Sequence, residues 1–451
     1  MKINNKSKIE NLIIMVACIG MFLSTLDTGI MNIALPFLTH HFETTNHIAT
    51  ISISGYTMTL AAVIMFFGVL SDKIGKLKVS LYGFIIFGLS SLLAGFSVNI
   101  DMLIFFRIFQ GIGAAGLQAT SIAMITTFVS KERLHIAIGI LGIAIGLGPV
   151  LGPTIGGLFL SLGDWRWIFW MNVPIVLISL LTNIFLVKNV KEHLVVQQKI
   201  DRIGVMLSSV IIICLLSGLS SVQNHGNLAG LLILTAIIFT WILFKIEHHQ
   251  TNPLFSLKLY KKSQHLGLFL LETMIFGFAS ALIFLFPPFL LEKHLGVSAG
   301  LAGLFVLGTP VGLVIFSRIS SKLNQGNKGR KFVSIGFIMM TLSFILLFTF
   351  HTLLTPVLVT IFLFIYGIGG GLFQPANIAL ISKSVPITIQ GEIGSLQRMV
   401  QNIGISTGVT IGGVILSLHD SLLQNINIGW LLGAVVLAVI IIIDCFSSDH
   451  N

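Results

Sequence analysis

Long apolar runs recur along the whole chain at a spacing of roughly 30 residues. Each run is long enough to cross a bilayer, which takes about 20 predominantly apolar residues in a helix. The pattern predicts an all-α polytopic membrane protein with fourteen transmembrane helices. The predicted spans are residues 12–34, 48–70, 79–98, 102–128, 136–160, 167–187, 203–222, 229–247, 266–291, 300–319, 332–351, 354–381, 393–418 and 429–447.

The segments between the apolar runs are short. The longest inner one, residues 246–265, is too short to bury a core of its own. The run from 332 to 381 is divided only by a weak break at Thr352–Pro356. We therefore expect the function to reside among the helices.

Basic residues collect in every second segment between the runs. Lys and Arg are retained on the cytoplasmic side of short loops, and all but four of the 26 basic residues fall in segments that would face that side. The exceptions are Arg166 and Lys293 in outer loops, and Arg107 and Arg398 within spans. This alternation predicts an even number of spans in a bacterial inner membrane, with both termini in the cytoplasm.

The composition agrees with this class, since 55% of residues are hydrophobic and 9% are charged, against roughly 25% charged in soluble domains. The net charge of +10 is scattered over the inner loops, which favours membrane topology and anionic lipid over nucleic acid as its explanation. Cys18, Cys214 and Cys445 lie in apolar stretches without CxxC spacing. They indicate neither a metal site nor a disulfide framework.

An internal repeat divides the chain. Residues 111–125 (GIGAAGLQATSIAMI) and 367–381 (GIGGGLFQPANIALI) share seven of fifteen positions at an offset of 256, which also places Gly148, Gly152 and Gly156 on Gly404, Gly408 and Gly412. Two matched blocks in corresponding spans indicate a parallel repeat of six-helix units. The predicted organisation is an N-terminal bundle (1–190), two inserted helices with a linker (191–264) and a C-terminal bundle (265–451).

Two segments suggest moving parts. Residues 68–79 (GVLSDKIGKLKV) form an inner loop in which Asp72 lies between Gly68 and Gly75, so a tight turn can place its carboxylate beside a helix N-terminus or a cation such as Lys73 or Lys76. We interpret the loop as a conformational latch, with a simple membrane anchor as the alternative. In GLGPVLGPTIGG (146–157), Gly148, Gly152 and Gly156 form a ridge of small residues that permits close helix approach. We expect Pro149 and Pro153 to bend this segment, which ends at Gly157. Helix packing alone would also explain the ridge.

These motifs, with LDTGIMNIALP (26–36) and RIFQGIGAAG (107–116), resemble those of the fourteen-span drug:proton antiporter family of the major facilitator superfamily. In the loop 68–79, Lys73 and Lys76 replace arginines that are usual in the superfamily pattern. The resemblance covers the whole chain. It implies the major facilitator fold of two six-helix bundles plus two inserted helices, and export of drugs such as fluoroquinolones, dyes and quaternary ammonium compounds.

Few charged residues lie within the predicted spans. Asp27 and Glu272 are well inside, and Asp444 is close to the inner end of the last span. Such residues are costly to insert and are functional candidates, with a structural ion pair as the alternative. With a rise of about 1.5 Å per residue, Asp27 and Arg107 are expected at a similar depth in the outer half of the membrane. The same estimate puts Glu272 and Arg398 at a similar inner depth.

We predict proton coupling by Asp27, Glu272, Arg107 and Arg398, because no His lies in mid-span and a carboxylate in low dielectric can bind and release a proton. Each polar or aromatic candidate for the substrate cavity could instead serve a helix–helix contact. These candidates are Asn32, Tyr56, Gln110, Gln118, Phe276, Tyr366, Gln374, Asn377 and Gln397.

The expected protein is a proton-coupled antiporter that exports lipophilic cationic or zwitterionic drugs by alternating access, with Asp27 as the main coupling carboxylate. We expect it to be a monomer in lipid, driven by the proton-motive force, without a cofactor, a metal or nucleic acid. The alternatives are a tetracycline–metal or physiological-solute antiporter on the same scaffold and, less favoured, a nutrient symporter. A membrane-embedded enzyme is disfavoured because the spans hold no nucleophile–base or metal set. A channel is disfavoured because no filter loop is present.

Overall fold

The computed structural model describes residues 2–192, 202–222, 226–249, 265–323, 329–385 and 390–448. The inserted-helix region predicted over 191–264 is therefore described only in part. Several basic residues assigned to inner loops lie outside the described residues, namely Lys199, Lys258, Lys261, Lys262 and Lys328.

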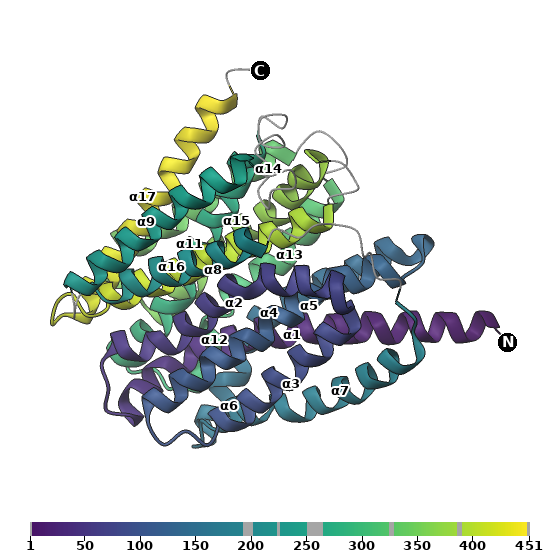
Figure 1. The fold of residues 1–451 in the computed structure, drawn as a ribbon. Coiled ribbons are helices and arrows are strands. Elements are labelled where there is room, and N and C mark those ends of the chain that lie inside the picture. Colours follow the sequence, from purple (N-terminus) through teal and green to yellow (C-terminus); the bar gives the residue numbers. More distant parts are fainter. Residues whose placement is uncertain are drawn as a thin grey trace. The chain divides into compact units, whose positions relative to one another are not determined.

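The described chain is a succession of helices (Figure 1). In order, they are α1 (Lys2–His41), α2 (Asn46–Ile74), α3 (Lys76–Ala94), α4 (Ile100–Phe128), α5 (Lys131–Ser161), α6 (Trp167–Trp170), α7 (Asn172–Asn189), α8 (Arg202–Ser220), α9 (Gly226–His249), α11 (Leu266–Phe289), η1 (Leu290–His294), α12 (Ala299–Phe305), α13 (Gly308–Leu323), α14 (Gly329–Thr349), η2 (His351–Leu353), α15 (Pro356–Lys383), α16 (Gln390–Ile415) and α17 (Leu422–Ser448).

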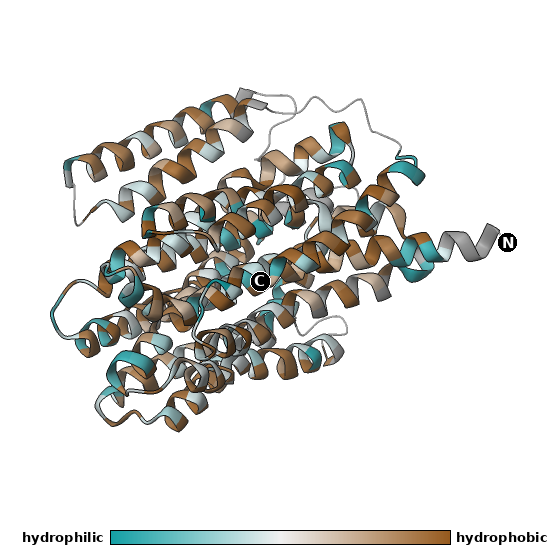
Figure 2. Ribbon diagram, turned by 90° about the horizontal axis from the view of Figure 1, so that it is seen from below, coloured by the Kyte–Doolittle hydropathy of each residue, from teal (hydrophilic) through white to brown (hydrophobic). Residues whose placement is uncertain are grey.

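Eleven helices among the described residues are long and apolar enough to cross a membrane. Figure 2 shows hydrophobic residues along the helices and many of the hydrophilic ones at their ends and in loops. The predicted spans 136–160, 203–222 and 393–418 coincide with α5, α8 and α16, which are not among the eleven. An all-α polytopic membrane protein is thus confirmed, while the count of fourteen spans stays a prediction.

The helix boundaries follow local chemistry. Gly75 separates α2 from α3 with φ of 109°, in the left-handed region that favours glycine. Asn99 caps α4 by accepting a hydrogen bond from the Met102 amide at 2.8 Å. Thr355 caps α15, which starts at Pro356, so the weak break at Thr352–Pro356 does end one helix and begin another.

Some predicted boundaries differ from the structure. The first span was predicted to end at 34, but α1 continues through Pro36 to His41. Proline removes one backbone donor without ending this helix. The span predicted over 300–319 is broken into α12 and α13, which are separated by Val306 and Leu307.

The chain divides into two compact units. Unit 1 comprises Met1–Thr28, Gly55–Pro149 and Trp165–Ser256, and unit 2 comprises Gly29–Ser54, Val150–Asp164 and Leu257–Asn451. Helices α1, α2 and α5 contribute residues to both units. The division into bundles 1–190 and 265–451 with an insert at 191–264 stays a prediction.

The repeated glycines serve the same purpose in each unit. In unit 1, a Cβ on Gly113 of α4 would lie 2.5 Å from the Phe87 amide nitrogen of α3. In unit 2, a Cβ on Gly369 of α15, the repeat equivalent, would lie 2.5 Å from the Gly336 carbonyl oxygen of α14. Both helix pairs therefore approach to a distance that only glycine permits.

The ridge of small residues in α5 also has its counterpart. Gly152 and Gly156 of α5 face Gly29 and Ile33 of α1. Their repeat equivalents in α16 face α11, with a Cβ on Gly408 placed 2.6 Å from the Phe278 carbonyl oxygen. The internal repeat detected in the sequence thus corresponds to one packing scheme used twice.

The close approach of α3 and α4 gives a test of this packing. Gly113→Ala should destabilise the protein by on the order of 1–3 kcal/mol, because the added methyl group meets backbone atoms that cannot yield. Gly142→Ala in α5 is the matched control, since a Cβ there has nothing within 4 Å. It should be neutral or stabilising by up to about 1 kcal/mol. Thermal unfolding of both purified variants checks this, and equal melting temperatures would contradict the packing scheme.

Candidate functional site

The first buried charge cluster lies in unit 1, between α1 and α4. The exposed fractions of Asp27 and Arg107 are 2% and 0%. Arg107 Nη1 donates to Asp27 Oδ2 and, at 2.7 Å, to Gln110 Oε1. Gln110 Nε2 donates to Asp27 Oδ1 at 2.8 Å. Both carboxylate oxygens of Asp27 are therefore occupied by donors from α4.

Neighbouring side chains hold this cluster in place. The Arg107 guanidinium lies over the Tyr56 ring at 4.3 Å, and the Tyr56 hydroxyl donates to the Ser24 carbonyl at 2.9 Å. Gln110 Nε2 also donates to Ser91 Oγ at 2.9 Å. A cation over an aromatic ring and hydrogen bonds to the charged groups partly offset the cost of burying them. The similar depth predicted for Asp27 and Arg107 is matched by direct contact.

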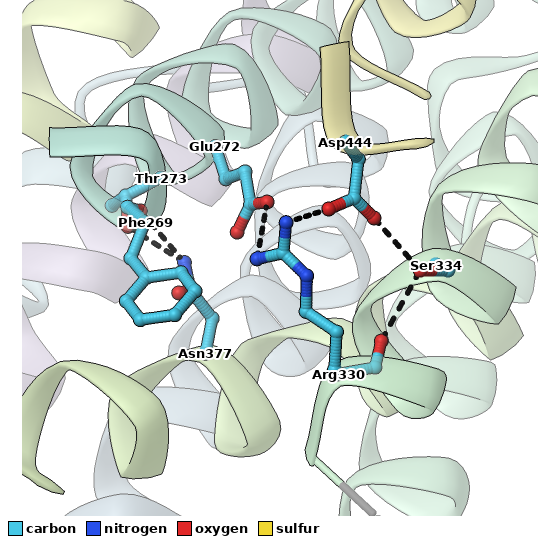
Figure 3. Close-up of polar contacts among 7 residues, drawn as sticks. All are labelled: Phe269, Glu272, Thr273, Arg330, Ser334, Asn377 and Asp444. Carbon is cyan, nitrogen blue, oxygen red and sulfur yellow. Dashed lines mark hydrogen bonds and ion pairs between the residues drawn. The ribbon is translucent and has the colours of Figure 1, made fainter. Parts of the chain in front are cut away.

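The second cluster lies in unit 2, where α11, α14 and α17 meet (Figure 3). Arg330 Nη1 lies 3.3 Å from Glu272 Oε1, and Arg330 Nη2 donates to Asp444 Oδ1. Ser334 Oγ donates to Asp444 Oδ2 at 2.8 Å. Glu272 is completely buried, and its Oε2 has no hydrogen-bond partner among the described residues.

Glu272 and Arg398 were predicted to lie at a similar depth, and the ion pair of Glu272 is with Arg330. Arg398 Nη1 instead donates to Gln401 Oε1 at 3.3 Å. Arg330 is the second residue of α14, so its position in the sequence suggested an inner loop. Its long side chain nevertheless reaches inward to the buried acids.

The remaining cavity candidates fall into both units. In unit 1, Gln118 Nε2 donates to Ser24 Oγ at 3.0 Å. In unit 2, the Tyr366 and Ser280 hydroxyls lie 3.0 Å apart, and Asn377 Nδ2 donates to Thr273 Oγ1 at 2.9 Å.

The other candidates all belong to unit 2. The rings of Phe276 and Phe373 lie 5.0 Å apart. Asn32 is buried, and Gln374 and Gln397 are half-buried. Most of the set therefore makes contacts between helices.

The loop 68–79 has one partner that the sequence did not suggest. Lys76 Nζ lies 3.2 Å from Asp72 and 3.6 Å from Glu192, which follows α7. Glu192 Oε1 also accepts a hydrogen bond from the Lys76 amide at 2.8 Å. The carboxylate at the N-terminus of α3 is thus that of Glu192, a favourable place for an anion. Lys73 lies exposed beside this network.

Within the part of the chain that the structure describes, no group of three or more His, Cys, Asp or Glu side chains could hold a metal ion. The two clusters combine carboxylates with arginines.

Known proteins share this architecture. A family model described as Major Facilitator Superfamily matches residues 17–408 and 268–447. The riboflavin transporter RibZ of Clostridioides difficile is 30% identical over 398 residues, covering 88% of this chain and 86% of that protein. Multidrug resistance protein 3 of Bacillus subtilis is 28% identical over 402 residues, covering 88% and 78%.

Solved structures resemble the chain in fold. A POT family transporter crystallised with 5-aminolevulinic acid superposes with a TM-score of 0.75 at 13% identity, covering 97% of this chain and 96% of that one. At this identity the similarity concerns the fold alone.

The contact between Asp27 and Arg107 predicts energetic coupling. Asp27→Asn and Arg107→Gln should each destabilise the protein by on the order of 3–5 kcal/mol, because each leaves an uncompensated buried charge. The double variant removes both charges and should lose clearly less than the sum. Thermal unfolding of the native protein, the two single variants and the double variant, followed by tryptophan fluorescence, measures this coupling as a double-mutant cycle.

The pair of Asp72 and Lys76 provides the control double-mutant cycle, because the Asp72 side chain is 63% exposed and an ion pair with an exposed partner is worth only about 0–1 kcal/mol. Additive losses at Asp27 and Arg107 would show that the two charges do not stabilise each other.

Proposed function

The chain belongs to the major facilitator superfamily and is a membrane transporter rather than an enzyme, and on this basis we propose that it is a proton-coupled antiporter. It exports lipophilic cationic or zwitterionic compounds, including drugs, by alternating access. Asp27 is the main coupling carboxylate. The protein spans the bacterial inner membrane with both termini in the cytoplasm, and the proton-motive force drives it.

The observation that carries this proposal is the cluster of Asp27, Arg107 and Gln110. A carboxylate within an apolar helix bundle is costly and marks an ion or substrate pathway. Here the carboxylate is held by an arginine and an amide from one neighbouring helix, α4. Movement of α4 relative to α1 would therefore change the charge environment of Asp27 in a single step.

The hydrogen bonds of Asp27 suggest a competition. Both of its oxygens accept hydrogen bonds in this structure, so a proton or a cationic substrate that binds there would compete with Arg107 and Gln110 for the carboxylate. Proton and substrate would thus compete for Asp27, which is the requirement for exchange of one for the other.

The packing of glycines supports alternating access. In unit 2, Gly157 of α5 abuts the Ala299 carbonyl of α12, where a Cβ would lie 2.7 Å away. Lys293 Nζ donates to Asn46 Oδ1 at 2.9 Å. These contacts join helix ends predicted to face outward, and their formation and release would close and open that side. The loop 68–79 with Glu192 would act similarly at the inner side.

The relatives favour two substrate classes. The Bacillus subtilis multidrug resistance protein supports drugs, and the acids Asp27 and Glu272 suit a monocation or a zwitterion. The riboflavin transporter RibZ supports transport of a physiological solute as the alternative. A tetracycline–metal antiporter would use the same scaffold. A nutrient symporter is less favoured because the GPTIGG segment (152–157) resembles that of antiporters.

Asp27→Asn should abolish substrate-driven proton movement, because the amide keeps the volume of the side chain and cannot carry the exchangeable proton. Energised everted vesicles with a pH-sensitive dye measure this. In the native protein, addition of ethidium should restore the quenched fluorescence, whereas in Asp27→Asn it should not. The variant Asp27→Asn/Arg107→Gln, which leaves no unpaired charge, should give the same loss.

The exposed Asp101, at the start of α4, provides the control: Asp101→Asn should respond as the native protein does. Recovery with ethidium in both Asp27 variants would contradict the assignment of Asp27. Recovery of the native protein with riboflavin and not with ethidium would favour the physiological-solute alternative.

A further inference from the structure

One cation inside unit 2 lacks a carboxylate partner. Arg398 lies in α16, eight residues after the helix begins at Gln390, and its side chain is half-buried. Its Nη1 donates to the neutral amide oxygen of Gln401 at 3.3 Å, and it forms no ion pair with any acid that the structure describes. An arginine stays charged in a protein. A guanidinium without a counter-charge in a helix bundle is costly.

The other arginines that reach into the helix bundles are paired. Arg107 pairs with Asp27, and Arg330 pairs with Glu272 and Asp444. Arg398 is thus exceptional among the described arginines placed within the helix bundles. A charged residue at such a place is a functional candidate.

The acid on the neighbouring helix does not serve this arginine. Met274 and Phe278 of α11 contact Gly404 and Gly408 of α16 in the same order along the chain, so the two helices run parallel. This register places Glu272 about one helical turn from the arginine along the helix axes. Glu272 nevertheless forms its ion pair with α14, across from α16. The guanidinium of α16 is therefore left for another anion.

A polar stripe continues from Arg398 along α16. Asn402 and Ser406 follow at intervals of four residues, so the three side chains lie on one side of the helix. Both are buried, and the Ser406 hydroxyl has no hydrogen-bond partner among the described residues. Gly413, seven residues after Ser406, lies on the same side and packs against Thr50 of α2. At its outer end this side of α16 therefore faces protein.

The internal repeat shows that helix packing does not require the stripe. The glycines of α5 and α16 that contact neighbouring helices are shared between the two repeats. At the same offset of 256, the equivalents of Arg398, Asn402 and Ser406 are Gly142, Gly146 and Val150. A Cβ on Gly142 would have nothing within 4 Å. The polar side chains are therefore an addition to a helix whose packing scheme works without them.

We propose that Arg398 binds the carboxylate of a zwitterionic substrate, with Asn402 and Ser406 on the same side of the site. The guanidinium presents donors in a planar fork that matches the two oxygens of a carboxylate. The bound carboxylate supplies the counter-charge that the described acids do not. This assignment rests on the proposed export of zwitterionic compounds, and it narrows them to those that carry a carboxylate.

Binding to the purified protein tests the proposal without transport. Norfloxacin is a zwitterion with a carboxylate, and its ethyl ester keeps the ammonium but lacks the carboxylate. In nanodiscs of phosphatidylcholine, titration followed by the fluorescence of each compound gives the two dissociation constants. The native protein should bind norfloxacin roughly 10- to 100-fold more tightly than the ester. Arg398→Gln should remove this preference by weakening norfloxacin alone.

Further variants separate loss of the site from loss of the fold. Arg398→Lys should keep part of the preference, because it retains the charge without the planar fork. Arg318→Gln, which alters an exposed arginine of α13, is the matched control and should keep the native preference. The melting temperature of Arg398→Gln should equal or exceed that of the native protein, because the substitution removes an uncompensated charge.

Several results would overturn the proposal. The native protein could bind both compounds equally or neither, or Arg398→Gln could weaken both alike. A preference that is lost on addition of inorganic phosphate at constant ionic strength would assign Arg398 to free anions. A preference that is lost when phosphatidylglycerol is included in the nanodiscs would assign it to lipid headgroups.

The outcome is independent of the test of antiport. Binding of norfloxacin that depends on Arg398, together with no exchange of ethidium for protons, would contradict the proposed function and leave the carboxylate site intact. Exchange of ethidium for protons without a preference that depends on Arg398 would leave the antiport intact and overturn the site.

Discussion

The account depends on the cost of placing charge inside an apolar helix bundle. Each buried carboxylate in this protein must be balanced by a cation, by hydrogen-bond donors or by a proton. Asp27 is balanced by Arg107 and Gln110, which occupy both of its oxygens. Glu272 and Asp444 share Arg330. In the proposed function, a change in helix packing that separates any of these groups changes the demand for a proton.

Glycine packing supplies the framework in which such changes can occur. Gly113 and Gly369, equivalent in the repeat, each bring two helix backbones into contact. The ridges of α5 and α16 do the same against α1 and α11. The polar clusters are attached to this framework, with Asp27 on α1 and Glu272 on α11.

Much of this arrangement could be predicted from sequence, because hydrophobic length and loop charge report directly on membrane spans. The repeat and the similar depth of Asp27 and Arg107 could also be predicted, the latter because depth can be counted along a helix. Depth does not reveal which way a helix faces or how far a side chain reaches. For that reason Arg330 was assigned to a loop, its ion pair with Glu272 was not predicted, and the roles of Gln110 and Glu192 were missed.

Exchange of protons for a cation is tested most directly with purified protein in liposomes whose membrane potential is clamped to zero. Liposomes loaded at lower pH than the bath should accumulate ethidium above its external concentration as protons leave. The accumulation should collapse when an ionophore removes the pH difference. Ethidium that equilibrates to equal concentrations at every imposed pH difference, or that follows a sodium gradient instead, would contradict the account.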